Sequence, residues 1–127
     1  EEHPDVFGRR MVVKGKTLEL VRKSGFVISH CSTALNFAVL FQKPVVFITT
    51  DSLQQSQRMA CSIQEAAVWL GKTPINVDAP INPDWEKELA ADPEAYARYR
   101  EAYIKTSGSP EKPTWQILAD YLKASEV

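Results

Sequence analysis

Apolar residues in the first half of this chain gather in two short runs on either side of a longer apolar segment. Phe26-Val27-Ile28 and Val45-Val46-Phe47-Ile48 are rich in β-branched and aromatic residues, which favours strands. Residues 34–41 between them are almost wholly apolar. A helix with that composition should pack on a sheet with little exposed surface. The pattern therefore predicts a β-α-β unit in which both strands are buried.

The alternation of strands and helices continues on both sides of this unit. The other predicted elements before residue 79 are a strand at 11–13, a helix from about Thr17 to Gly25, a helix from Asp51 or Ser52 to about Leu70, and a short strand at 75–77. Such alternation is typical of a parallel sheet with helices on both faces. We predict an α/β fold in which residues 1–78 form a partial Rossmann-like nucleotide-binding half-domain.

Prolines punctuate the remaining residues, 79–127, which we predict to be helical. Asn82-Pro83 and Asp92-Pro93 each combine a capping residue with a proline in the first helical turn, and a last helix should begin near Pro113. These helices carry the aromatic residues Trp85, Tyr96, Tyr99, Tyr103, Trp115 and Tyr121. We interpret the rings as core or domain-contact residues, so the helices should fold back on the α/β core or bridge to another domain.

Composition excludes several classes of function. The chain has 127 residues, 44% hydrophobic and 24% charged, as in an ordinary globular domain. Its formal net charge of −1 gives no basic field for nucleic acid, and no apolar run approaches the roughly 20 residues of a membrane span. Cys31 and Cys61 lack metal-like spacing. These features predict a cytoplasmic protein with reduced thiols and no zinc site.

The first residues, Glu-Glu-His-Pro, begin abruptly and without Met. We therefore expect this chain to be part of a longer protein whose missing portion precedes residue 1. A half-domain with few strands agrees with that expectation.

The candidate chemistry lies in the turn His30-Cys31-Ser32-Thr33, between the first strand of the β-α-β unit and its helix. Free N–H groups and the helix dipole favour an anion at such a position. Ser and Thr are also ordinary N-caps, so the turn has a purely structural interpretation as well. The two adjacent hydroxyls, the imidazole and the position at a strand end lead us to favour phosphate binding.

Three further polar residues belong to the same region. Thr49 and Thr50 follow the next strand and are possible rim residues of a ligand site, whereas Asp51 is better explained as an N-cap. Asn36 is the lone amide of an apolar helix, for which we favour a structural hydrogen bond.

Four motifs together resemble the C-terminal donor-binding half of GT-B glycosyltransferases: His3-Pro4, Gly15-Lys16-Thr17, residues 28–33 and residues 43–47. A His-Pro dipeptide followed one β-α-β step later by paired hydroxyls looks like bacterial sialyltransferases, polysialyltransferases and CDP-glycerol glycerophosphotransferases. The turn lacks the aspartate usual in glycerophosphotransferases, and residues 32–42 lack the glutamate with which many UDP-sugar enzymes bind ribose.

The resemblance implies a cytidine-activated donor, CMP- or CDP-linked, as substrate, with no cofactor and no required metal. By it, His3 would contact the donor phosphate while Ser32 and Thr33 hold it at the helix N-terminus, and His30 would also suit that anion. The glycan acceptor and the general base would belong to a missing N-terminal domain, so no catalytic residue is assigned and this chain alone should be inactive. Such an enzyme would make surface or capsular polysaccharide in the cytoplasm or at the inner face of the membrane.

Two other interpretations stay open. A UDP-sugar 2-epimerase-like protein shares the GT-B architecture and would prefer uridine nucleotides. A noncatalytic interaction module of the same fold would bind no nucleotide, and its residues 30–33 would be only a helix cap.

Overall fold

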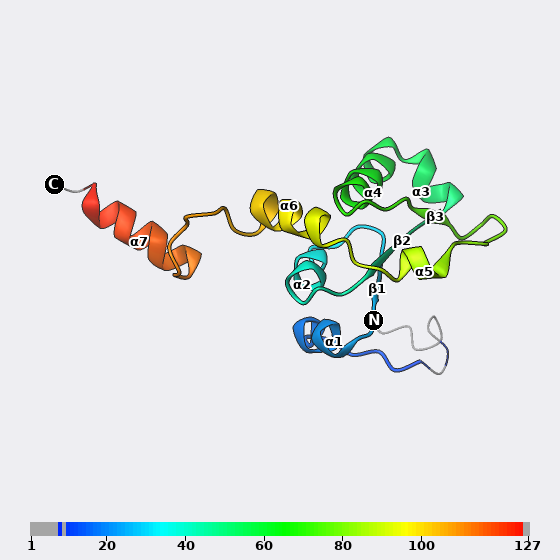
Figure 1. The fold of residues 1–127 in the computed structure, drawn as a ribbon, viewed down its shortest axis with the longest axis horizontal. Helices are drawn as coiled ribbons and strands as arrows, with labels where there is room; N and C mark the ends of the chain where they lie inside the picture. The colour runs from blue at the N-terminus through cyan, green and yellow to red at the C-terminus, as the bar shows by residue number, and fades with distance from the viewer. Residues whose placement is uncertain (1–7, 9, 126–127) are drawn as a thin grey trace.

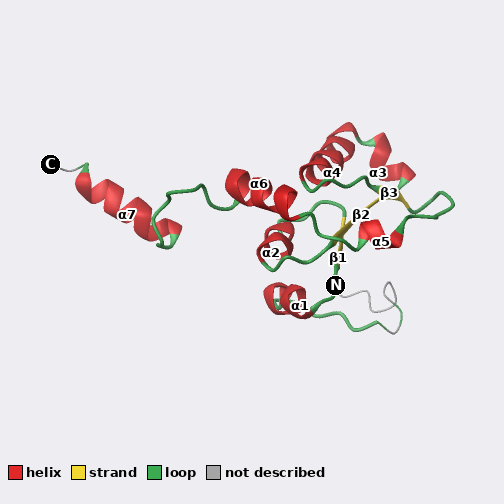
Figure 2. Cartoon of the chain, in the orientation of Figure 1, coloured by secondary structure: helices red, strands yellow, loops and turns green. Residues whose placement is uncertain are grey.

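Three parallel strands form the centre of the structure (Figures 1 and 2). The computed structural model describes residue 8 and residues 10–125. The strands are β1 (Val27–Ser29), β2 (Val45–Thr49) and β3 (Ile75–Asn76), in the spatial order β1-β2-β3. Val27 pairs with Val45 and Ile48 pairs with Ile75. The predicted α/β class, with a partial parallel sheet flanked by helices and a helical C-terminal segment, is confirmed.

Seven helices accompany the sheet in the described part of the chain. They are α1 (Thr17–Lys23), α2 (Leu35–Leu40), α3 (Asp51–Gln55), α4 (Gln57–Trp69), α5 (Trp85–Glu88), α6 (Pro93–Tyr103) and α7 (Thr114–Ala124). None of these helices is long and apolar enough to cross a membrane, among the residues that the structure describes.

The hydrophobic core lies on the face of β2 that carries Val45 and Phe47. Both side chains are buried, and they pack in one cluster with residues of α2, α4 and α6. Burial of each such side chain stabilises the fold by about 1.5–3 kcal/mol. The buried residues that the three helices contribute are Leu35, Ala38, Val39, Ala67, Leu70, Tyr96 and Tyr99. The prediction of a buried apolar helix beside a buried strand at 45–48 is therefore confirmed.

The prediction that the first strand is also buried is wrong. β1 pairs only with β2 in the described sheet, so it is an edge strand. Phe26 beside it is 44% exposed and Ile28 within it is 59% exposed. Side chains alternate between the faces of a strand, so Ile28 points to the face opposite the core cluster.

The expected strand at 11–13 does not form. Met11 is 84% exposed and Val12 is 57% exposed, and no strand pairs with this segment in the described structure. A helix does begin at Thr17 as predicted and ends before Gly25. Only Val21 of this helix is buried, because α1 packs against α2 along one narrow stripe.

The single helix predicted from residue 51 or 52 to residue 70 is two helices. Ser56 is extended (φ −85°, ψ 103°) and separates α3 from α4. The N-cap of α3 is Thr50 rather than Asp51 or Ser52, because the Thr50 hydroxyl accepts the Leu53 N–H at 3.1 Å. The predicted end of α4 at Gly71 is confirmed, and Gly71 has a φ of +69°.

The helices after residue 79 differ in how they pack. α5 begins after Asp84, whose carboxylate accepts the Lys87 N–H, and not after Asn82 as predicted. The predicted Asp92-Pro93 start of α6 is confirmed. Through Tyr96 and Tyr99, α6 belongs to the same core cluster as the strands. The proposed division of the chain at residue 78 stays a prediction.

The last helix, α7, stands apart from the rest of the described chain (Figure 1). It begins after Pro113, as predicted, and none of its residues is buried. Trp115 is 79% exposed and Tyr121 is 70% exposed. The segment therefore neither folds back on the α/β core nor contacts another element closely.

Candidate functional site

The turn from His30 to Thr33 joins the carboxyl end of β1 to the start of α2. The Ser32 hydroxyl accepts the Ala34 N–H at 3.2 Å, and the Ser32 carbonyl accepts the Leu35 N–H at 3.1 Å. The Thr33 carbonyl accepts the Asn36 N–H at 3.2 Å. These bonds make a tight turn in which one of the two hydroxyls already has a structural task. The Ser32 hydroxyl closes the turn before the helix, but the N-cap residue of α2 is Ala34 and no side chain caps this helix, so the capping interpretation accounts for neither hydroxyl.

Several hydrogen-bond donors of this turn are unpaired within the described chain. The N–H groups of Ser32 and Thr33 and the Thr33 hydroxyl donate to no described residue. All four residues of the turn are solvent-exposed. Because α2 has only six residues, these discrete donors matter more for an anion than the dipole of the helix.

The turn forms one wall of a cavity of about 400 Å³. That volume lies within the usual range of small-ligand pockets. The structure thus brings three predicted site residues, His30, Ser32 and Thr33, to the same hollow. The cavity is lined by Ser29, His30, Cys31, Ser32, Thr33, Leu35, Asn36, Phe47, Ala66, Tyr99 and Tyr103.

Asn36 makes the structural hydrogen bond that its position in an apolar helix indicated. Its Oδ1 atom accepts the Tyr99 hydroxyl at 3.1 Å, which ties α2 to α6 beside the cavity. Burial raises the pKa of Tyr99, so the hydroxyl keeps its proton and remains the donor. Asn36 also lines the cavity.

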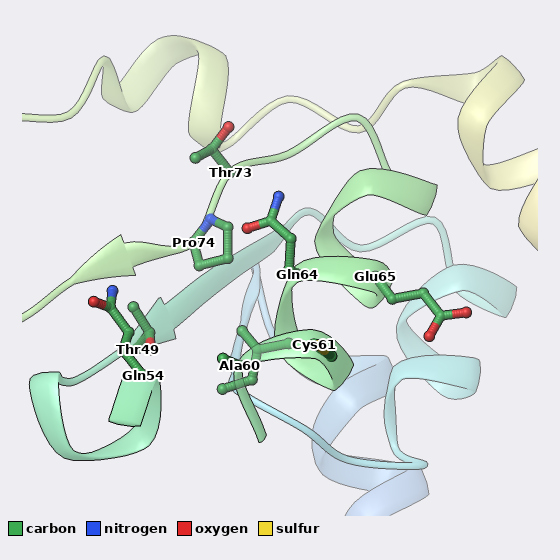
Figure 3. Close-up of a pocket in the computed structure, with 9 residues that line it drawn as sticks. Thr49, Gln54, Ala60, Cys61, Gln64, Glu65, Thr73 and Pro74 are labelled. Carbon is green, nitrogen blue, oxygen red and sulfur yellow. The ribbon is translucent and has the colours of Figure 1, made fainter. Parts of the chain in front are cut away.

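The other predicted site residues are not among the described residues that line this cavity. His3 lies outside the described residues, so its approach to His30 stays a prediction. Thr49 is buried and lines a different hollow, of about 640 Å³ (Figure 3), while the Thr50 hydroxyl caps α3. Figure 3 shows Gln64 of α4 reaching toward Thr73 and Pro74 across this second hollow.

Hydrogen bonds of polar side chains link the segments that follow the carboxyl ends of β2 and β3. The Asn76 amide donates to the Asp51 carboxylate at 2.7 Å, and the Asp51 N–H donates to the Asp78 carboxylate at 2.8 Å. The Asp78 N–H in turn donates to the Asn76 side-chain oxygen at 3.0 Å. Two carboxylates make this strand end unsuited to a phosphate. An anion is therefore better accommodated at the end of β1.

Sequence reasoning did not assign Tyr99 and Tyr103 to the site. Their spacing places them on one face of α6, together with Tyr96. That periodicity identifies the apolar face of the helix but not the surface against which it packs. In the structure the face covers α2 and α4, so both rings reach the cavity beside the turn.

The described residues contain no group of three or more His, Cys, Asp or Glu side chains that could hold a metal ion. Cys31 and Cys61 are free and exposed, and Cys31 lies in the turn after β1. Comparison of the chain with protein-family models, with curated proteins and with solved structures finds no match.

Proposed function

We propose that this chain is the donor-binding portion of a glycosyltransferase in bacterial surface polysaccharide biosynthesis, with a CMP- or CDP-activated sugar as its donor. The observation that carries the proposal is the turn after β1, whose unpaired N–H and hydroxyl donors border a cavity of about 400 Å³. Open parallel sheets bind ligands at the carboxyl ends of their strands. The protein would act on the cytoplasmic side of the membrane.

In this proposal the turn binds the phosphate that leaves with the nucleotide. The N–H groups of Ser32 and Thr33 and the Thr33 hydroxyl donate to phosphate oxygens, and the exposed His30 imidazole supplies a further donor. Such preorganised donors stabilise the negative charge that develops on the leaving phosphate. The donor sugar then passes to a glycan acceptor, which binds together with the general base on a domain preceding this one.

The first test is nucleotide affinity in the intact protein, measured by calorimetry with CMP, CDP, UMP and UDP. Replacing both hydroxyls (Ser32→Ala with Thr33→Ala) should weaken cytidine nucleotide binding at least tenfold. A hydrogen bond to a charged group is worth about 1.5–3 kcal/mol, and 1.4 kcal/mol corresponds to a factor of ten. Asp84→Ala is the matched control, because it removes the cap of α5 and should leave affinity unchanged.

The outcomes separate the three interpretations. Unchanged affinity in the folded double variant would refute phosphate binding at the turn. Preference for UMP and UDP would favour a UDP-sugar 2-epimerase-like enzyme instead. No binding of any nucleotide would favour a noncatalytic module in which residues 30–33 only begin α2.

A further inference from the structure

A second, smaller hollow adjoins the cavity beside the turn. Its volume is about 170 Å³, and it lies where α4 and α6 pack against each other. The two hollows share Ala66, Tyr99 and Tyr103 as lining residues. The smaller one is lined by Ser62, Glu65, Ala66, Trp69, Tyr99 and Tyr103.

Three aromatic rings form its walls. The ring of Trp69 stands at 88° to that of Tyr103, with the ring centroids 5.1 Å apart. The ring of Tyr99 lies at 32° to Tyr103, with centroids 4.8 Å apart. One tilted pair and one perpendicular pair of rings thus make a corner. The faces of aromatic rings carry partial negative charge, so a group inside such a corner experiences a negative potential.

The smaller hollow is also lined by an acidic residue, Glu65. The Glu65 carboxylate accepts only a long hydrogen bond, 3.4 Å, from the Tyr103 hydroxyl. It forms no ion pair with any described residue, although five other acidic side chains of the chain do. Figure 3 shows the Glu65 side chain pointing away from Gln64, Thr73 and Pro74, and Glu65 lines both the larger hollow and the smaller one. The carboxylate is therefore available to a ligand at the aromatic corner.

We propose that this corner binds a small organic cation, a substituted ammonium group. A quaternary ammonium needs no hydrogen-bond acceptor for each substituent, and it is attracted both by ring faces within about 6 Å and by a nearby carboxylate. An anion would be repelled by Glu65. The site rests on contacts between α4 and α6 and does not require that the neighbouring turn bind a nucleotide.

Choline is a suitable probe, with 3,3-dimethylbutan-1-ol as its uncharged analogue of the same shape. Trp69 can report binding when the other two of the three tryptophans in this sequence are replaced, so the assay uses the protein with Trp85→Phe and Trp115→Phe. Both replaced rings are exposed, at 52% and 79%. Choline should give a saturable change in Trp69 fluorescence, and the uncharged analogue should bind at least tenfold more weakly.

Two variants test which groups recognise the cation. Glu65→Gln keeps the shape of the side chain and should weaken choline binding at least fivefold, whereas Glu86→Gln on exposed α5 should not change it. Tyr103→Leu should abolish binding, and Tyr121→Leu, which removes a 70% exposed ring of α7, should not. Circular dichroism establishes that each variant is folded.

The proposal is overturned if choline gives no saturable signal or if the uncharged analogue binds equally well, which would indicate an apolar hollow only. Undiminished binding by folded Glu65→Gln would overturn it too. Each of these results leaves the nucleotide titrations unaffected, so the two proposals can fail separately.

Discussion

The Tyr96 hydroxyl donates a 2.8 Å hydrogen bond to the backbone carbonyl of Lys43, 53 positions earlier in the chain. Lys43 lies in the short connection between α2 and β2, at the heart of the β-α-β unit. Tyr96 itself is only 1% exposed. This contact fixes α6 to the unit that positions the candidate phosphate turn.

Tyr96 should make the fold sensitive to alkali. Burial raises the pKa of Tyr96 to about 12 from its ordinary value of 10.0. The contribution of this group is fully present below about pH 10 and is lost as pH rises toward 12, because the unfolded chain releases the proton first. The free energy of unfolding should therefore fall by about 1.4 kcal/mol per pH unit in that window, as measured by urea denaturation.

The Tyr96→Phe variant isolates this effect from the other tyrosines. At pH 8 it should be less stable by about 1 kcal/mol, because the Lys43 carbonyl loses its donor. Between pH 10 and pH 12 its stability should fall less steeply than that of the wild type. Parallel pH profiles for the two proteins would show that Tyr96 does not titrate as proposed.

Two helices end in the same way but with different residues at the critical position. After α2 the Lys43 N–H bonds to the Ala38 carbonyl, and after α4 the Lys72 N–H bonds to the Ala67 carbonyl, both at 2.8 Å. The residue just before each lysine has a left-handed backbone conformation. It is Gln42 (φ +52°) after α2 and Gly71 (φ +69°) after α4. Such helix ends favour glycine.

Gln42→Gly should therefore stabilise the protein by roughly 0.5–1 kcal/mol, since it relieves the strain of a left-handed residue that has a Cβ atom. Gly71→Ala should destabilise it by about 1 kcal/mol. An added Cβ at Gly71 would meet Asp92 Oδ2 only at 3.7 Å, so the cost comes from the backbone. Thermal unfolding of both variants measures these two changes in stability. A destabilised Gln42→Gly protein would contradict the argument.

Lys72 connects the end of α4 to α5. Its buried ammonium donates to the carbonyls of Lys87 and Glu88, at 2.5 Å and 2.9 Å, and lies 3.9 Å from the Glu88 carboxylate. Burial lowers the pKa of Lys72, while the Glu88 charge opposes that change. Lys72→Met keeps the apolar stem but leaves the Glu88 carbonyl without a donor, while the Lys87 carbonyl keeps only the 3.3 Å bond from the Ala90 N–H. It should reduce the free energy of unfolding by about 1–3 kcal/mol.

Lys23→Met is the control for Lys72→Met. It removes an exposed ion pair with Glu19, four residues away on α1. Such a pair contributes about 0.3–0.5 kcal/mol. Equal losses in the two variants, measured in the same denaturant titration, would show that the α5 carbonyls do not depend on Lys72.

The exposed face of α7 should contribute little to the stability of the core. Trp115→Ser should change the free energy of unfolding by less than about 0.5 kcal/mol, because this ring is 79% exposed and none of the residues of α7 is buried. Phe47→Ala, in contrast, should cost about 3–5 kcal/mol, since Phe47 is 1% exposed in the core cluster. A large loss on replacing Trp115 would mean that α7 packs against another surface in solution.

Several local features of the structure were predictable because their cause is local. The apolar residues 34–41 and 45–48 require burial whatever surrounds them, which predicts a covered helix and a central strand. Asp92-Pro93 predicts the start of α6, because the Asp92 carboxylate accepts the N–H groups of Glu94 and Ala95. The hydroxyls of the turn after β1 were identified for the same reason.

Other features depend on contacts that no local pattern records. Phe26-Val27-Ile28 has the composition of a buried strand, yet β1 is an edge strand, because its exposure depends on which strands pair beside it. The helical pattern from 51 to 70 does not reveal that the chain turns at Ser56. Likewise, the spacing of Tyr99 and Tyr103 predicts a shared face of α6 but not the partner of that face.

The sequence by itself thus determined the β-α-β unit, the turn at its first strand end and most helix starts, because burial and capping act between near neighbours. The tertiary structure decided what surrounds that turn. The cavity combines β1 and α2 with Phe47 of β2, Ala66 of α4 and two rings of α6. These segments meet only because parallel strand pairing and helix packing bring together residues as far apart in the sequence as His30 and Tyr103. The free energy of those contacts exists only in the folded chain.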